Sequence, residues 1–94
     1  MNQAIFKFEA PFENEFSLQM PTKSQILSVQ QDQKTMKPCI WALVYPSNPK
    51  EERFFELYGT GHSIFNDMGI QRKYIGTYQC LNGEFIGHLF ERED

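Results

Sequence analysis

The chain has 94 residues, 40% of them hydrophobic and 15% aromatic, and its formal net charge is −3 at pH 7. The nine Lys and Arg residues are scattered, which argues against duplex nucleic acid as a partner because such binding depends on phosphate neutralisation. No apolar run approaches the roughly 18 residues of a membrane span, and the N-terminus lacks the pattern of a signal peptide. We therefore expect a single β-rich domain over residues 1–94 that lies in the cytoplasm and contacts no membrane.

Alternating or continuous apolar runs predict a series of short strands separated by turn residues. In chain order these runs are AIFKFEA at 4–10, FSLQM at 16–20, QILSVQ at 25–30, CIWALVY at 39–45 and RFFELY at 53–58. The polar tract QDQKTMK at 31–37 predicts a loop or hairpin tip. CIWALVY is apolar throughout, which favours a strand at the centre of a sheet because such a strand is covered on both faces.

A hairpin is predicted near the C-terminus, where Asn82-Gly83 separates two β-prone runs. Asn-Gly favours a type I′ turn, because both central residues of that turn take positive φ. A two-residue turn fixes the facing pairs as Leu81 with Glu84, Cys80 with Phe85, Gln79 with Ile86, Tyr78 with Gly87, Thr77 with His88, Gly76 with Leu89 and Ile75 with Phe90. We interpret His88 as a hydrogen-bonded or exposed sheet histidine beside Thr77.

Two glycines of this hairpin, Gly76 and Gly87, would weaken an ordinary strand. In the predicted register a large side chain lies across each of them, Tyr78 over Gly87 and Leu89 over Gly76, and recovers the packing. Neither glycine therefore needs a ligand to explain it.

The remaining elements complete the predicted fold. SIFNDMGIQRK at 63–73 is the only stretch that could form a helical turn, with Ser63 as its cap and Gly69 as its end. Cys39 and Cys80 fit neither a disulfide framework nor a zinc-ligand spacing, and we interpret both as buried thiols. The fold class is mainly β: a small antiparallel β-sandwich or open barrel of about seven short strands, with at most one short helical turn.

Five stretches form an ordered pattern along the chain: MPTKSQILSVQ, CIWALVYP, YGTGHSI, YIGTYQ and GHLFE. In this order they resemble a family of small uncharacterised proteins encoded in bacteriophage and prophage genomes. The resemblance extends over most of the chain, from about Phe6 to Glu91, and WALV and GTGH are its more specific marks. It implies a phage accessory protein and assigns no catalytic role to any position.

The Gly59-Thr60-Gly61-His62 loop has two interpretations, since it lacks the Lys of a P-loop and the third glycine of a dinucleotide fingerprint. In the first, the glycines permit a bulge or left-handed turn at a strand end, and His62 hydrogen-bonds the loop. In the second, exposed amides form an anion nest that nearby cations complete, and an aromatic ring stacks on a base. The candidate ligand-binding residues are Tyr58, Gly59, Thr60, Gly61, His62, Arg53, Arg72, Lys73 and Tyr74.

Catalysis needs a nucleophile with a base and an orienting group, and the chain has no nucleophile elbow and no kinase or metal-ligand pattern. His62 adjoins Ser63, but neighbouring residues of a strand point to opposite faces. We therefore expect a protein that is not an enzyme, with no catalytic residues, no metal and no cofactor.

Three functional hypotheses follow. The first is a phage-encoded accessory protein that binds and inhibits a bacterial host protein, a component of a defence system, through its exposed aromatic residues. The second is a sponge that sequesters a small nucleotide immune signal in the 59–62 loop, and the third is a minor virion or assembly protein. We expect the chain to act in the cytoplasm of the infected bacterium and, because short β-rich chains expose sheet edges, to form a homodimer.

Overall fold

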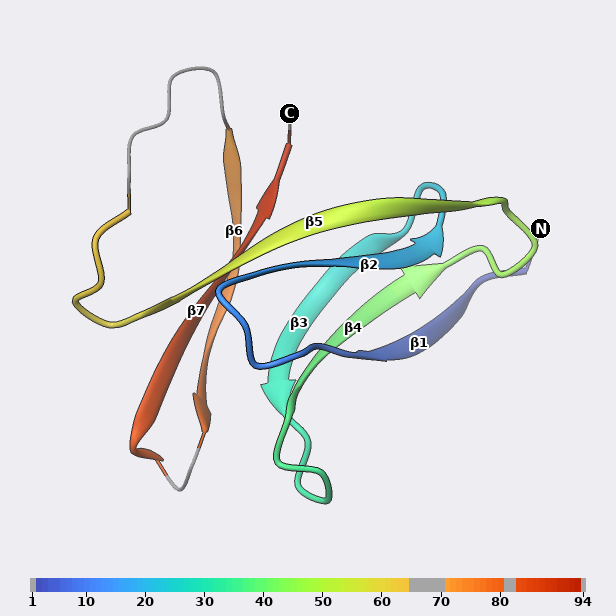
Figure 1. Ribbon diagram of the computed structural model, residues 1–94. Helices are drawn as coiled ribbons and strands as arrows, with labels where there is room; N and C mark the ends of the chain where they lie inside the picture. The colour runs from blue at the N-terminus through green and yellow to red at the C-terminus, as the bar shows by residue number, and fades with distance from the viewer. Residues whose placement is uncertain (1, 65–70, 81–82, 94) are drawn as a thin grey trace.

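The computed structural model describes residues 2–64, 71–80 and 83–93, and it contains seven antiparallel strands in two sheets (Figure 1). The strands are β1 (Ala4–Glu9), β2 (Glu15–Pro21), β3 (Gln25–Gln31), β4 (Pro38–Val44), β5 (Lys50–Gly59), β6 (Arg72–Cys80) and β7 (Phe85–Arg92). No α-helix occurs in the described residues, so they include no helix that could span a membrane. The helical turn predicted within 63–73 falls mostly on residues outside the described ranges.

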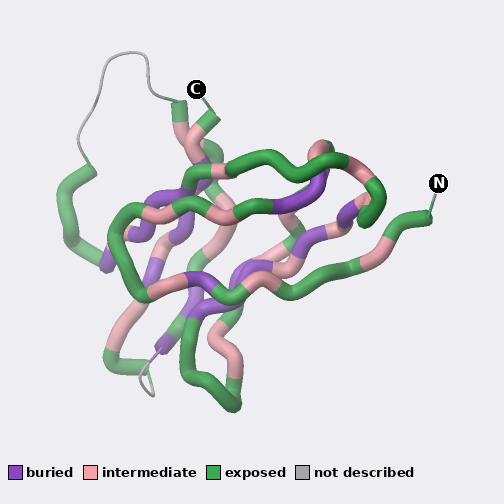
Figure 2. The backbone as a smooth tube through the Cα atoms, turned by 45° about the vertical axis from the view of Figure 1, so that its right-hand side comes forward, coloured by how far each residue is buried: buried purple, intermediate pink, exposed green. Residues whose placement is uncertain are grey.

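The strands are divided between a three-stranded sheet, in the order β1-β4-β3, and a four-stranded sheet, in the order β2-β5-β7-β6. The predicted central position of the continuous apolar run is confirmed, because β4 lies between β1 and β3. Most residues of β4 are buried, whereas β1 at the sheet edge is mainly exposed (Figure 2). The predicted mainly β class, with about seven short antiparallel strands, is confirmed.

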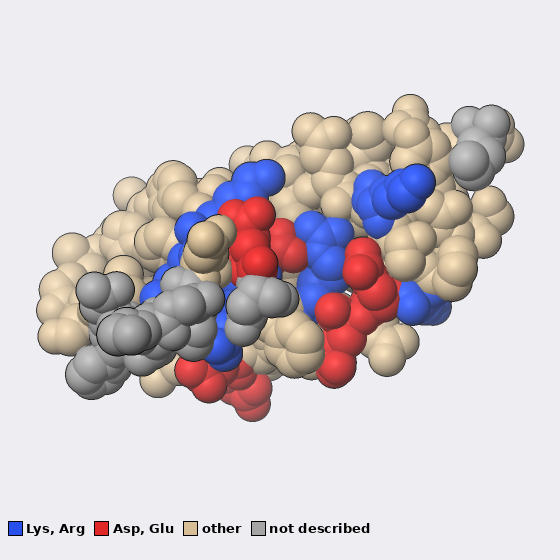
Figure 3. Space-filling view, turned by 90° about the horizontal axis from the view of Figure 1, so that it is seen from above, with Lys and Arg blue, Asp and Glu red and all other residues tan. Residues whose placement is uncertain are grey.

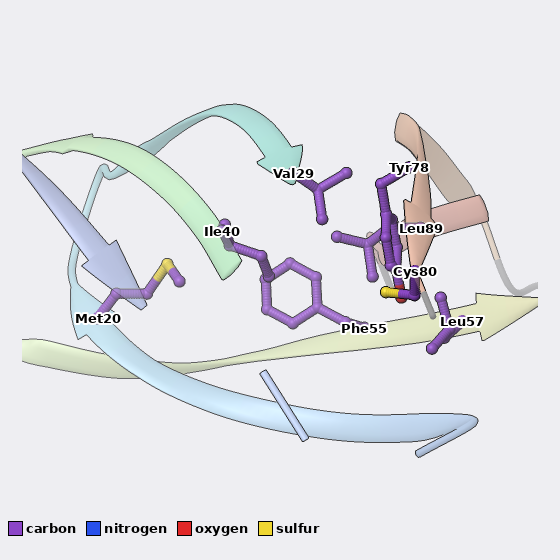
Figure 4. Packing of buried hydrophobic residues seen from close by; sticks show 8 residues of the cluster. All are labelled: Met20, Val29, Ile40, Phe55, Leu57, Tyr78, Cys80 and Leu89. Carbon is purple, nitrogen blue, oxygen red and sulfur yellow. The ribbon is translucent and has the colours of Figure 1, made fainter. Parts of the chain in front are cut away.

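The core lies between the two sheets and takes side chains from both (Figure 4). Its buried members are Met20, Val29, Ile40, Phe55, Leu57, Tyr78, Cys80 and Leu89. Alternation along the strands explains this set, because every second residue of a strand points to the same face. Cys39 and Cys80 are buried free thiols, as predicted, and burial raises the pKa of each.

The predicted hairpin register is confirmed from Cys80↔Phe85 to Gly76↔Leu89. Gly83 has a φ of 86°, the positive value that the turn prediction required, while Leu81 and Asn82 lie outside the described residues. The pairing of Ile75 with Phe90 is wrong. A bulge between Tyr74 and Gly76 leaves Ile75 unpaired and brings Tyr74 opposite Phe90 instead.

The two hairpin glycines are covered, although by only one of the predicted side chains. At Gly87 a Cβ atom would lie 2.7 Å from Cζ of Tyr78, so the Tyr78 ring does cross this glycine. At Gly76 the predicted cover by Leu89 is wrong. The atom above Gly76 is Cγ1 of Val29, 3.1 Å from the position of a Cβ, because β3 of the opposite sheet approaches β6 here.

A largely buried ion pair joins β5 to β7. Arg53 of β5 donates two hydrogen bonds to the Glu91 carboxylate of β7, from Nε to Oε2 at 2.5 Å and from an Nη to Oε1 at 2.9 Å. The other Nη donates to the backbone carbonyl of Ser24, in the turn between β2 and β3, at 2.7 Å. Arg53 therefore ties two strands of one sheet to the turn that leads into the other sheet.

The hairpin tip between β3 and β4 is held by Asp32. Its carboxylate accepts hydrogen bonds from the backbone N–H groups of Lys34 at 2.7 Å and Thr35 at 3.0 Å. It also forms an ion pair with Lys7 of β1, at 2.5 Å. The hydrogen bond from Lys7, supported by the two backbone donors, holds the pKa of Asp32 well below its usual range. The contribution of Asp32 to stability is thus present at neutral pH and is lost as the pH falls below its ordinary pKa, near 4.

An Asp32→Asn variant tests this pH dependence. Asparagine keeps the turn-forming side-chain oxygen but has no charge for Lys7. We expect the wild type to have the higher melting temperature at pH 6, and the difference to narrow as the pH falls toward 2, in a calorimetric series. Glu13→Gln, which neutralises an exposed carboxylate between β1 and β2, is the matched control. A difference between wild type and Asp32→Asn that stays constant across the series would contradict the assigned ion pair.

Candidate functional site

The Gly-Thr-Gly-His segment forms a tight turn at the end of β5. The backbone N–H of His62 donates to the carbonyl of Gly59 at 3.1 Å, and the N–H of Gly59 donates to Nδ1 of His62 at 3.2 Å. Gly61 has a φ of 87°, a left-handed value that favours glycine. A Cβ on Gly59 would lie 2.9 Å from the His62 ring. The predicted turn geometry and the predicted His62 hydrogen bond are confirmed.

This turn is one rim of a hollow of about 420 Å³ on the four-stranded sheet. The hollow lies on the outer face, because its strand residues alternate with core residues such as Leu57, Tyr78 and Leu89. Its described lining consists of Tyr58, Gly59, Thr60, Gly61, His62, Ile64, Tyr74, Thr77, His88 and Phe90. The turn, β6 and β7 thus build one concave surface from segments far apart in the sequence.

A chain of hydrogen bonds crosses the hollow from its rim to its far wall. Oγ1 of Thr60 and Nε2 of His88 are 2.7 Å apart, and Nδ1 of His88 is 2.9 Å from Oγ1 of Thr77. The same Thr77 hydroxyl is 2.6 Å from the hydroxyl of Tyr74. The prediction that His88 is hydrogen-bonded beside Thr77 is confirmed, and the same bonds fix the turn against both strands.

Three aromatic rings from three strands line the outer face at this hollow. The rings of Tyr58 and Phe90 are 5.9 Å apart at 79°, and those of Tyr74 and Phe90 are 5.5 Å apart at 60°. The Tyr58–Phe90 pair is edge-to-face, which is favourable because the positive edge of one ring meets the negative face of the other, and the Tyr74–Phe90 pair is tilted. Tyr74 remains 55% exposed even so, and its ring is available for contact.

A buried carboxylate lies beside the aromatic rings on the same face. Glu56 is only 2% exposed and accepts hydrogen bonds from the Tyr58 hydroxyl and from Nε of Arg72, the latter at 2.6 Å. Nε of Arg92 is 3.3 Å from its second oxygen. Burial alone would raise the pKa of Glu56, but the hydrogen bonds and the two guanidinium charges outweigh it and hold this pKa below the usual value.

The structure brings only part of the predicted site together. The candidates that line the hollow are Tyr58, Gly59, Thr60, Gly61, His62 and Tyr74. The three cations expected to complete an anion nest are elsewhere: Arg53 is paired with Glu91, Arg72 is paired with Glu56, and Lys73 lies beside Arg53 in a different hollow. On the face that holds this second hollow, acidic and basic side chains are interleaved (Figure 3).

Sequence reasoning missed four members of the hollow: Ile64, Thr77, His88 and Phe90. The hairpin register did place Thr77 beside His88, and this pairing was the available signal for two of them. Alternation along β7 places Phe90 on the face of His88, and this was the available signal for Phe90; its pairing with Tyr74 depends on the bulge. Within residues 2–64, 71–80 and 83–93, no three His, Cys, Asp or Glu side chains are grouped as metal ligands.

Comparison with known proteins gives one finding. A family model described as "Domain of unknown function (DUF7352)" matches residues 1–94, the whole chain. No curated protein and no solved structure matches.

Proposed function

We propose that this chain, which belongs to the DUF7352 family, is a non-enzymatic accessory protein of phage or prophage origin that binds and inhibits a bacterial host protein. The host protein in this proposal is a component of an antiviral defence system, and the setting is the cytoplasm of the infected cell. The WALV and GTGH marks support the phage setting. The observation that supports protein binding is the hollow, with its exposed aromatic and aliphatic rim.

The hollow has the features of an interaction surface. Tyr74 and Ile64 at its rim are 55% and 46% exposed, so two large apolar side chains face solvent beside the same concavity. Aromatic anchors next to such concavities contribute most of the binding energy in many protein interfaces. Phe90 and the hydrogen bonds through His88 hold the walls in place, which lowers the ordering cost on binding.

The charge distribution favours a protein partner over a nucleotide. Phosphate recognition relies on Arg or Lys side chains or on well-presented backbone amides. The cations predicted for that task are engaged with carboxylates or lie in another hollow. For the sponge hypothesis, the aromatic rings that could stack on a base do line the hollow, but the cations predicted to hold the phosphate do not.

The proposal is tested by native mass spectrometry on tagged protein gently purified from phage-challenged bacteria. We expect the wild type to carry a host protein at a fixed stoichiometry, and the same spectrum reports whether the chain is a homodimer. Tyr74→Ala and Ile64→Ser should each lower the retained partner, because loss of an interface anchor weakens binding by about 30-fold or more.

Phe6→Ala and Ile5→Ser are the matched controls, since both remove exposed apolar side chains from β1 of the other sheet. They should retain the partner at the wild-type level. A bare wild-type chain would refute the proposal, as would a partner retained equally by the hollow variants and the controls. A nucleotide that co-purifies and is lost in Tyr74→Ala would favour the sponge instead.

A further inference from the structure

We infer that the hollow takes an uncharged, apolar side chain of the partner protein, such as that of phenylalanine or leucine. This inference rests on the proposed function and specifies the chemistry of the group that is recognised. It depends on three observations: the charge of the lining, the state of its polar atoms, and the exposure of its rim.

The lining is matched to an uncharged group. The described residues around the hollow include no Lys, Arg, Asp or Glu. A charged group would find no counter-charge among these described residues, whereas an apolar group needs none. The adjoining hollow, which shares Tyr58 and His62, differs in this respect because it includes the carboxylate of Glu15.

Each polar side chain of the described lining already has a hydrogen-bond partner. The hydroxyls of Thr60, Thr77 and Tyr74 are all bonded in the chain that passes through His88. The hydroxyl of Tyr58 is bonded to Glu56, and Nδ1 of His62 accepts from the Gly59 amide. An apolar side chain would leave all of these bonds in place and gain from burial of its own surface.

The apolar surface that such a side chain would cover is open to solvent. Tyr74 and Ile64 are both exposed and stand at the rim, and the Phe90 ring lies between those of Tyr58 and Tyr74. Burying this apolar area on binding is favourable. Because the rings come from three strands of one sheet, the site is set by the sheet and not by the turn alone.

The test uses chemical-shift titration of the isotope-labelled chain with three separate probes: N-acetylphenylalaninamide, inorganic phosphate and adenosine monophosphate. We expect the phenylalanine amide to shift backbone resonances in 59–62, 74–77 and 88–90 saturably, with a Kd of about 1–10 mM for so small a ligand. Phosphate should leave these resonances unmoved at the same concentrations. Tyr74→Ala should weaken the phenylalanine amide by about 10-fold, while Phe6→Ala should bind it as the wild type does.

Two results would overturn the inference: shifts in 59–62 caused by phosphate or the nucleotide but not by the phenylalanine amide, or no saturable shift with any probe. Both are distinct from a failure of the proposed function. A host protein captured through Tyr74, together with no response to the phenylalanine amide, would contradict the inference but support the proposed function. A saturable response to the phenylalanine amide without a captured host protein would support an apolar site but contradict the proposed function.

Discussion

The Glu91→Ala variant is expected to be about 2–3 kcal/mol less stable than the wild type, because the partly buried Arg53 guanidinium loses the carboxylate that accepts two of its hydrogen bonds. The two groups form a bidentate pair, with N–O distances of 2.5 and 2.9 Å, and both side chains are largely buried. Arg53 would keep one acceptor, the Ser24 carbonyl, which carries no charge. Urea unfolding followed by circular dichroism measures the difference.

Two further variants separate the ion pair from the mere loss of a carboxylate. Glu93→Ala removes an exposed carboxylate two residues away and should change stability by less than about 0.5 kcal/mol. The double variant Arg53→Met, Glu91→Leu removes both charges and should recover most of the loss, because apolar side chains of similar size replace buried ion pairs well. A Glu91→Ala variant as stable as Glu93→Ala would contradict the assignment of a buried pair.

Gly87→Ala is expected to destabilise the domain by about 1–3 kcal/mol through overpacking. The new Cβ would lie 2.7 Å from Cζ of Tyr78 and 2.9 Å from its hydroxyl oxygen, and the Tyr78 ring is buried in the core and cannot swing aside. Gly76→Ala, in the facing strand, should cost less because its Cβ meets only one methyl group, Cγ1 of Val29, at 3.1 Å. Thermal unfolding of the two variants shows which of them loses more stability.

The Tyr78 ring supplies a second check on this contact. Its hydroxyl is buried and has no hydrogen-bond partner among the residues that the structure describes, so Tyr78→Phe removes an unsatisfied group and one of the three closest atoms to the new Cβ. We expect Tyr78→Phe alone to be at least as stable as the wild type, and to relieve part of the Gly87→Ala loss when the two are combined. Additive effects of the two changes would contradict the contact.

Local patterns predicted the strands and most of the hairpin, because alternation and turn chemistry are readable over a few residues. The bulge at Ile75 could not be read in this way. Glycine within a strand, here Gly76, is common at bulges, but it does not say at which residue the pairing shifts. The bulge brings Tyr74 against the Phe90 ring, a contact between two strands. This one-residue shift is also what places Tyr74 at the hollow.

The cations of the predicted site do not line the hollow, and strand geometry explains why. Arg53 and Tyr58 are an odd number of residues apart on β5, so their side chains point to opposite faces of the sheet. Lys73 adjoins Tyr74 on β6, and these two side chains also point to opposite faces. Arg72 shares the face of Tyr74, but Glu56 engages it. Glu56 becomes a buried partner of Arg72 only because three strands pair in the fold, and no short stretch of sequence predicts that contact.

We propose the outer face of the four-stranded sheet, at the hollow, as the binding surface. Hydrogen–deuterium exchange on the complex purified from infected cells, compared with the chain alone, would locate that surface. We expect added protection in peptides that cover 58–64, 74–77 and 88–90, and unchanged exchange in β1 at 4–9. Protection concentrated in β1, with the hollow peptides unchanged, would contradict it and move the binding surface to the opposite sheet.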